Sequence, residues 1–131
     1  MRNLIVFSFV MMLTQIVTQT ADEQIVNTWK GGAPGQENNW ACSKNWSLGR
    51  IPGVFDNVII PDVSTGSQKF PVINSGLTEI NQLYIHTGAT LTLQENVHIL
   101  VNELHCAGIC IGCSKGIWIE GSASEAIVKN K

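Results

Sequence analysis

The sequence predicts an all-β protein, a short right-handed parallel β-helix-like solenoid with an irregular, tryptophan-rich N-terminal cap. Three observations support this fold class. Apolar residues flank a single outward residue again and again between residues 57 and 119, the alternation typical of half-buried strands. Strands this short cannot each bury a core, so neighbouring strands must stack. The same strand order also recurs after about 20 residues, as in a solenoid.

The repeat is clearest where residues 80–83, Ile-Asn-Gln-Leu, match residues 101–104, Val-Asn-Glu-Leu. Gly88 and Gly108 fall at the expected corners, where a positive φ favours glycine. The alternative fold is a small antiparallel β-sandwich, in which the repeat would be coincidental. The other matches of the expected register are Leu91 and Leu93 with Ile109 and Ile111, and Val97 and Ile99 with Ile117 and Ile119.

Residues 1–21 have the layout of a secretory signal peptide. Arg2 is followed by an apolar run over residues 4–13, which is short for a membrane span. The alternatives are an uncleaved anchor and a buried N-terminal helix. A signal peptide predicts a protein that is secreted or held at the cell surface, with no membrane association after cleavage.

Residues 22–55 form the predicted cap segment. Residues 22–27 read as a polar lead-in, and the rest is rich in Gly, Pro and Asn with no strand or helix period. Trp29, Trp40 and Trp46 carry too much apolar surface to leave in water, since each indole buries on the order of 200 Å². We therefore expect a lid over one end of the β stack, and the alternative is an aromatic sugar-binding platform.

Residues 56–131 form the predicted solenoid. A first strand over residues 58–60 ends at Pro61, and a second over residues 70–73 carries Pro71, which confines it to an edge or to its beginning. The regular repeats follow, and residues 126–128 are expected to add a last strand.

Composition limits the function classes. The chain has 131 residues, a net charge of −2 and 14% charged residues, so it is one domain with a modest core. It has neither a basic patch nor an acidic run, which argues against a nucleic-acid partner.

The four cysteines allow three interpretations. Cys106, Cys110 and Cys113 have the spacing of the iron–sulfur site of radical-SAM enzymes. Those enzymes, however, need a long α/β barrel behind this motif. A zinc site would use His98 or His105 as a fourth ligand, although zinc ligands usually come as two close pairs. Disulfides are the prediction for an exported chain, with all three connectivities of these cysteines and Cys42 left open. We therefore expect no metal and no cofactor, with Cys106 facing inward and Cys110 outward.

The outward positions supply the candidate binding residues. If the coils stack in register, Tyr84 lies beside His105, and His98 lies beside Trp118. Asp56 and Asp62 flank one strand and could share a rim, but a turn-capping Asp56 and a solvated Asp62 are favoured. Because no convergent acid–base or nucleophilic set is evident, no catalytic residue and no enzyme activity are expected. The candidate ligand-binding residues are Trp29, Trp40, Trp46, Trp118, Tyr84 and His105.

Several short patterns follow one another in a distinctive order. They are W-x-G at residues 29–31, Trp40, N-W-S-x-G-x-x-P at 45–52, D-N-V-x-I-P at 56–61, F-P-V-I at 70–73 and I-x-x-L-x-I-x-x-G-A-x-L-x-L at 80–93. This order resembles a region near the start of large secreted or surface proteins of Bacteroidota, where it opens a right-handed β-helix. It is also similar to the eight-glycine extracellular domain of hyaluronan-processing and fibrocystin-like proteins. The resemblance implies an extracellular structural or adhesive part and carries over no catalytic residue.

Three functions from different classes are therefore expected. The leading one is a secreted, non-catalytic structural or adhesive surface module, which could pair with itself end to end into filaments. The second is an extracellular carbohydrate-binding module. The third is a fragment of a β-helical polysaccharide-degrading enzyme, which would need a cleft rimmed by acidic and basic residues.

Overall fold

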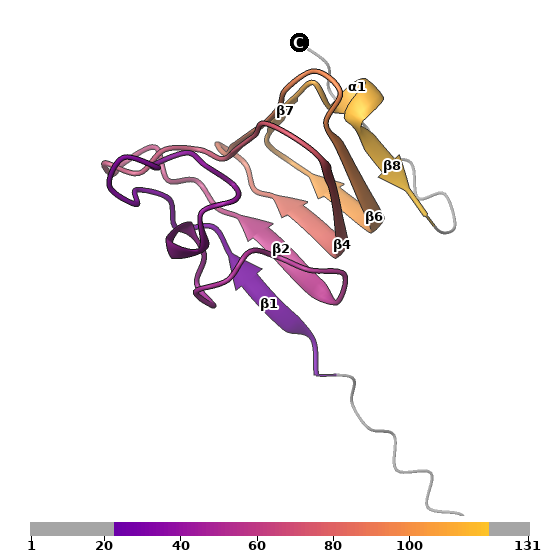
Figure 1. Cartoon of the computed structure of the whole chain (residues 1–131), viewed down its shortest axis with the longest axis horizontal. Helices are drawn as coiled ribbons and strands as arrows, with labels where there is room; N and C mark the ends of the chain where they lie inside the picture. Colours follow the sequence, from indigo (N-terminus) through magenta and orange to yellow (C-terminus); the bar gives the residue numbers. More distant parts are fainter. Residues whose placement is uncertain (1–22, 121–131) are drawn as a thin grey trace, which may run out of the picture.

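The computed structural model describes residues 23–120, which form a parallel β-solenoid of about three turns (Figure 1). The predicted fold class is confirmed. Every pairing between the named strands is parallel, so the alternative of an antiparallel sandwich is wrong. The predicted signal peptide, residues 1–21, and the expected last strand, residues 126–128, lie outside the described residues.

Two parallel sheets wind through the solenoid. The five-stranded sheet has the order β1 (Ile25–Thr28), β2 (Asp56–Ile60), β4 (Leu77–Ile85), β6 (His98–Cys106) and β8 (Ile117–Ile119). The three-stranded sheet has the order β3 (Val72–Ile73), β5 (Thr90–Leu93) and β7 (Ile109–Ile111). A short 3-10 turn, η1 (Ser43–Asn45), lies in the cap, and a one-turn helix, α1 (Cys113–Gly116), connects β7 to β8.

Strand β1 corrects the expectation of an irregular lead-in. It pairs in parallel with β2, from Ile25 opposite Asp56 to Thr28 opposite Ile59. Its sequence offers only two adjacent apolar residues and no alternation. The strand therefore forms because β2 presents an unpaired edge to it, a cause that its own pattern does not reveal.

The two long strands bend at an asparagine ladder. Ile80 and Leu83 are both buried although two residues separate them, so the period-two alternation is interrupted between them. At this bend Asn81 Nδ2 donates to Asn57 Oδ1 at 2.8 Å, and Asn102 Nδ2 donates to Asn81 Oδ1 at 2.9 Å. Repeated side-chain amides thus satisfy one another from coil to coil at a corner of the solenoid.

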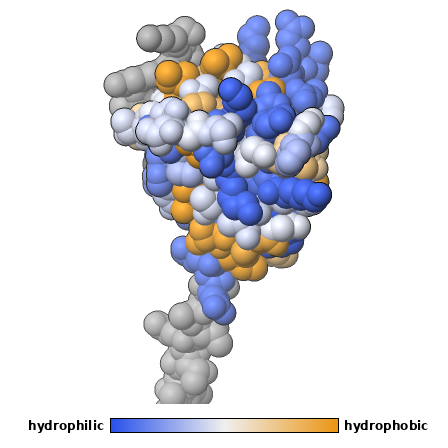
Figure 2. All heavy atoms as spheres, turned by 90° about the vertical axis from the view of Figure 1, so that its left-hand side faces the viewer, coloured by the Kyte–Doolittle hydropathy of each residue, from blue (hydrophilic) through white to orange (hydrophobic). Residues whose placement is uncertain are grey.

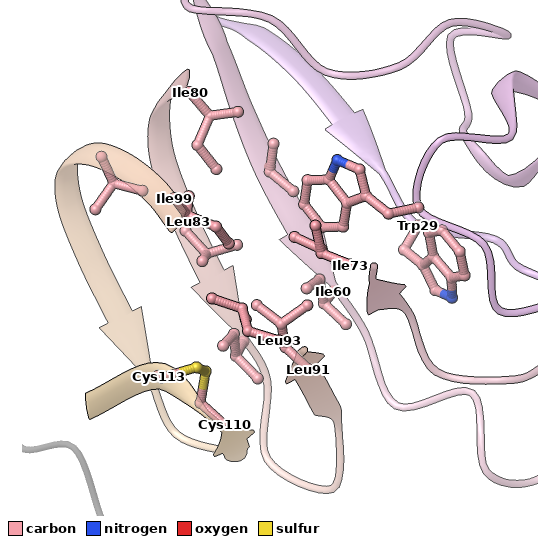
Figure 3. Packing of buried hydrophobic residues seen from close by; sticks show 14 of the residues in the cluster. Trp29, Ile60, Ile73, Ile80, Leu83, Leu91, Leu93, Ile99, Cys110 and Cys113 are labelled. Carbon is pink, nitrogen blue, oxygen red and sulfur yellow. A yellow bond between two sulfur atoms is a disulfide. The ribbon is translucent and has the colours of Figure 1, made fainter. Parts of the chain in front are cut away.

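The core consists of aliphatic columns that run along the solenoid (Figure 3). Leu83 lies over Val58 and under Leu104, as the predicted 21-residue match between β4 and β6 requires. Leu93 lies over Ile73 in the second sheet. Because each rung covers the one before it, strands of three or four residues share one continuous core.

The expected register between β5 and β7 is wrong by one residue. Leu91 pairs with Cys110 and not with Ile109. The turn before β7 contains only Ala107 and Gly108, whereas the turn before β5 contains residues 86–89. This shorter turn sets the strand register, and a one-residue shift exchanges the inward and outward faces. Cys110 is consequently buried, which corrects the expectation that it points outward.

The same shift places two isoleucines of β7 on the outer face. Ile109 is 43% exposed and Ile111 is 52% exposed. Between β6 and β8 the expected register is wrong by two residues, because Ile99 rather than Val97 pairs with Ile117. An even shift keeps the same face, so Ile117 still packs against the core, whereas Ile119 is exposed.

Glycine is required at the two corners, Gly88 and Gly108, for different reasons. Gly88 has a φ of 84°, as predicted. Gly108 does not have a positive φ, which corrects the expectation for it. A Cβ atom at Gly108 would overlap the carbonyl oxygens of His86 and Ala89, so glycine is required there by the close approach of the preceding coil.

The N-terminal cap closes one end of the solenoid, as the lid interpretation predicts. The rings of Trp29, Trp40 and Trp46 are buried, and the Trp46 ring makes edge-to-face contacts with the other two at centroid distances of 5.0 and 4.6 Å. Asn45 organises the chain around them. Its Oδ1 accepts from the Ala33 N–H at 2.8 Å, and its Nδ2 donates to the carbonyls of Gln36 and Asn39.

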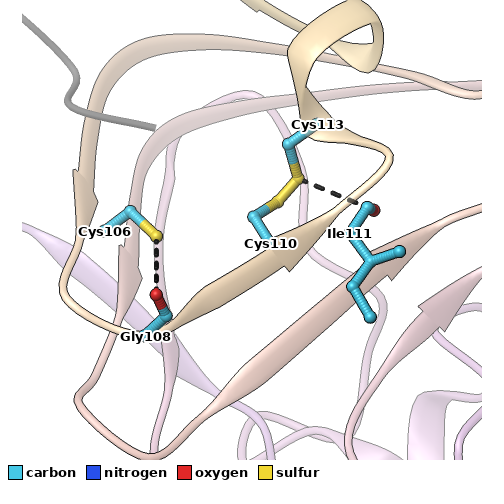
Figure 4. The surroundings of a disulfide bond; sticks show 5 residues. All are labelled: Cys106, Gly108, Cys110, Ile111 and Cys113. Carbon is cyan, nitrogen blue, oxygen red and sulfur yellow. Dashed lines mark hydrogen bonds between the residues drawn. A yellow bond between two sulfur atoms is a disulfide. The ribbon is translucent and has the colours of Figure 1, made fainter. Parts of the chain in front are cut away.

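A disulfide joins Cys110 to Cys113, with the two Cα atoms 5.6 Å apart (Figure 4). It ties the end of β7 to α1. Cys42 and Cys106 are free thiols. The pairing removes two of the thiolates that the zinc and iron–sulfur interpretations need.

Reducing this disulfide is expected to lower the free energy of unfolding by about 2 kcal/mol, because the bond closes only a very short loop. Urea unfolding with and without reductant, followed by far-UV circular dichroism, measures the change. The variant Cys110→Ala/Cys113→Ala is the matched control, since reductant should not alter its stability. If reductant lowers the stability of this variant as much as that of the natural chain, the effect does not come from this bond.

Candidate functional site

Outward side chains of β4 and β6 form a polar and aromatic ladder. The rings of Tyr84 and His105 stack with centroids 4.4 Å apart and planes 4° apart, so their predicted adjacency is confirmed. Gln82 Nε2 donates to Glu103 Oε2 at 2.8 Å, and the Tyr84 hydroxyl donates to Gln82 Oε1 at 2.8 Å. Glu103 Oε1 lies 2.7 Å from His105 Nε2. These groups satisfy one another and leave few free polar atoms to grip a ligand.

A second ladder lies near the C-terminal end of the described solenoid. His98 stacks on Trp118 with ring centroids 4.2 Å apart, which confirms the second predicted adjacency. Trp118 is 49% exposed. It therefore offers one ring face that His98 does not cover.

The other three tryptophans are not on the surface. Trp29 and Trp40 are no more than 3% exposed, and Trp46 is fully buried. Two of their indole groups also donate within the chain, from Trp29 Nε1 to the Lys69 carbonyl and from Trp46 Nε1 to the Trp40 carbonyl, each at 2.8 Å. Burial in the cap therefore leaves only Tyr84, His105 and Trp118 of the six candidate ligand-binding residues accessible.

The stacking geometry limits what the ladders can bind. A sugar ring packs against the open face of an aromatic ring. In the Tyr84–His105 pair each ring covers one face of the other, so at most the far face of each ring is left for a ligand. Because the polar groups around these rings also bond to one another, the ladder is better suited to holding coils together than to receiving a ligand.

A shallow depression of about 680 Å³ adjoins this ladder, lined in part by Tyr84, His86, His105 and Cys106. Burial raises the pKa of the Cys106 thiol, and this effect exceeds that of its hydrogen bond to the Gly108 carbonyl. A thiol held protonated is a weak nucleophile, because the thiolate is the reactive form. Cys106 is therefore not an activated nucleophile in this depression.

The two aspartates that flank β2 do not form a catalytic pair. Asp56 is buried, accepts two hydrogen bonds from the Arg50 guanidinium, and accepts another from the Gly53 N–H at 2.8 Å. Asp62 lies beyond the other end of the strand, where its Oδ1 accepts from the Ser64 N–H at 2.9 Å. Asp56 thus closes a turn, as expected, and Asp62 stabilises a second one. Within residues 23–120 no three metal-ligating side chains gather.

An apolar patch that the sequence analysis missed lies where β1 begins (Figure 2). Phe55 is 78% exposed and borders a hollow together with Ile25. The adjacent Val54 and Phe55, in a loop that contains Pro52 and Gly53, were the signal for it. The exposed apolar side chains of this region are Ile25, Val26, Ile51, Val54 and Phe55.

Comparisons with protein families, with curated proteins and with solved structures find no match to this chain. The resemblance to surface proteins of Bacteroidota and to the eight-glycine domain therefore stays a prediction. Over residues 23–120 no helix is long and apolar enough to cross a membrane.

Proposed function

We propose that this protein is a non-catalytic structural or adhesive module that acts outside the cell. One observation carries the proposal: the outward groups of successive coils bond to each other. Gln82 with Glu103 and Tyr84 with His105 show the pattern, in which polar and aromatic side chains are used between coils and not around a cleft. An enzyme would instead hold such groups poised toward a substrate.

The extracellular location rests on three separate supports. The apolar run after Arg2 has the layout of a secretory signal. The Cys110–Cys113 disulfide persists most readily in an oxidising compartment. The low charged fraction, 14%, suits an extracellular β protein.

Display of the full chain on a host cell tests the proposal. Cells that carry it should attach to immobilised matrix proteins, polysaccharides or cell layers several-fold more than cells that display Trp46→Ala, in which the cap is disrupted. The purified chain should release no reducing ends from the same polysaccharides. Equal attachment of both cell types, or release of sugar, would contradict the proposal.

Carbohydrate binding is the second candidate, favoured by the free ring face of Trp118. Because the other three indoles are buried, a bound polysaccharide should protect only Trp118 from acrylamide quenching. The control is Trp118→Phe, whose fluorescence should not respond to polysaccharide. Unchanged quenching of the natural chain across a polysaccharide panel would exclude this candidate.

A further inference from the structure

A cavity of about 450 Å³ lies between the turn that joins β5 to β6 and the short helix α1. The helix packs against β5, β6 and β8, and it lies near the upper end of β6 in Figure 1. Residues 93–98 form one wall of the cavity, and Gly112 and residues 114–116 form the other. The volume lies in the range of small-molecule sites, so a ligand the size of a sugar ring has room there.

Packing fixes both walls of the cavity. The Cys110–Cys113 disulfide ties the start of α1 to β7. At the other end of the helix, a Cβ atom at Gly116 would lie 2.6 Å from Leu93 Cδ2 and 2.9 Å from the Val97 carbonyl oxygen. A larger residue would therefore push the helix away from the coil beneath it. The cavity is formed before any ligand arrives, which lowers the cost of ordering the site on binding.

Polar side chains around the cavity have no partners within residues 23–120, in contrast to the groups of the β4–β6 ladder, which bond to one another. Glu95 and Lys115 lie on opposite walls, yet they form no ion pair. The side chains of this set are Gln94, Glu95, Asn96, Ser114 and Lys115. Their donors and acceptors are therefore available to a ligand.

His98 also lines the cavity, and its Nδ1 atom is buried without a hydrogen-bond partner among the described residues. A buried polar atom that makes no hydrogen bond is unfavourable, and most such atoms in proteins have a partner. A small turn of the imidazole would bring Nδ1 to a ligand hydroxyl group in the cavity, which would satisfy it.

Trp118 extends the polar cavity with an aromatic surface. Leu100 pairs with Trp118, so His98, two residues earlier in β6, lies between this tryptophan and the cavity. The stacked rings of His98 and Trp118, with centroids 4.2 Å apart, make the two regions continuous. A ligand longer than one ring can therefore occupy the cavity and reach the uncovered indole face.

The chemistry of the lining favours a neutral saccharide. Glu95 and Lys115 carry opposite charges, so an anion would meet the carboxylate and a cation would meet the ammonium group. A sugar hydroxyl both donates and accepts, so it can bond to carboxylate, ammonium, amide and hydroxyl groups placed side by side. The apolar face of a sugar ring packs well on an open aromatic face such as that of Trp118.

We propose that this cavity binds one unit of a neutral oligosaccharide and that Trp118 receives a later unit of the same chain. Lys115 and Glu95 bond the hydroxyl groups of the first unit from opposite walls, and His98 bonds it from the side nearest Trp118. This inference rests on the carbohydrate-binding candidate above and gives that candidate a site. It does not depend on the adhesive function.

Isothermal titration calorimetry of the full chain tests the site with neutral tetrasaccharides of glucose, mannose, galactose and N-acetylglucosamine. At least one should bind with a Kd of about 1 mM or lower. Lys115→Met should weaken this binding about tenfold, because it removes a charge-assisted hydrogen bond from the first unit. Trp118→Ala should weaken it as well, through loss of the stacked unit. Lys44→Met, an exposed change on the cap, should have no effect.

The imidazole ¹⁵N resonances give a second measurement, because the chain has three histidines and only His98 lines the cavity. The tetrasaccharide that binds should shift the His98 Nδ1 resonance and leave those of His86 and His105 unchanged. Equal shifts at all three histidines, or none at His98, would overturn the assignment of the cavity. Far-UV circular dichroism shows whether each variant is folded.

The remaining outcomes separate this inference from the functions proposed above. Binding that Trp118→Ala abolishes and Lys115→Met leaves unchanged would overturn the cavity as the site and keep the carbohydrate-binding candidate. Binding of none of the tetrasaccharides would overturn the inference and leave adhesion to its own test. Binding only by a chain shortened after residue 120 would mean that the removed segment occupies the cavity, and this too would overturn the proposal.

Discussion

The substitution Trp46→Ala is expected to lower the free energy of unfolding by about 3–5 kcal/mol, the range for removal of a large buried aromatic side chain. The Trp46 ring lies between those of Trp29 and Trp40 and is fully buried. Its loss opens a cavity at the centre of the cap and also leaves the Trp40 carbonyl without the 2.8 Å hydrogen bond from Nε1. Urea unfolding followed by far-UV circular dichroism measures the effect.

Two variants control this experiment. Trp118→Ala removes the same side chain from a half-exposed position and should cost less than about 1 kcal/mol. Trp46→Phe keeps much of the ring and should fall between the two. Equal losses for Trp46→Ala and Trp118→Ala would show that the cap contributes little to stability.

The substitution Arg50→Met is expected to lower the free energy of unfolding at neutral pH, because it leaves the buried Asp56 carboxylate without its cationic partner. Since the Arg50 side chain is 47% exposed, solvent screens the pair, and the loss should be smaller than for a fully buried ion pair. Arg50 Nη2 lies 2.7 Å from Asp56 Oδ1, and the guanidinium also bonds the second oxygen. The double variant Arg50→Met/Asp56→Leu removes the buried charge with its partner and should recover most of the loss.

The pH dependence of this loss has a defined sign. Burial alone would raise the pKa of Asp56, but the Arg50 guanidinium and the Gly53 N–H outweigh it and hold the pKa below its usual value. The stabilisation is therefore complete above the unfolded-state pKa of about 3.9, and it is lost as the pH falls through the lower folded-state pKa. The difference between the natural chain and Arg50→Met should shrink at about pH 3.

Urea unfolding at about pH 7 and at about pH 3 checks this expectation. Lys44→Met is the control, because Lys44 is exposed on the cap and its effect on stability should not change between these pH values. A difference between the natural chain and Arg50→Met that does not change with pH would mean that the ion pair is not its source.

The strands and their winding could be predicted because both follow from local patterns in the sequence. Alternation marks each strand, and the match of residues 80–83 with residues 101–104 states the 21-residue offset directly. Once that register is known, the stacking of Tyr84 on His105 follows from it. This part of the candidate site therefore needed no tertiary information.

The register of β7 could not be predicted by matching its apolar residues to those of β5. Ile109 and Ile111 resemble Leu91 and Leu93 more closely than Cys110 does, yet Cys110 takes the inward place. The two-residue turn at Ala107 and Gly108 decides the face, and Gly108 itself is required by the carbonyls of the coil before it. Neither cause lies in the composition of β7.

By itself the sequence determined that this protein is a stack of short parallel strands with repeating outer ladders and a tryptophan-rich lid. Only the tertiary structure decided that Cys110 bonds Cys113 in the interior and that Trp118 alone among the tryptophans reaches the surface. Alternation and repeat length belong to the chain itself. The burial of a side chain depends on which distant segment packs against it, and this is determined only when the coils pack together.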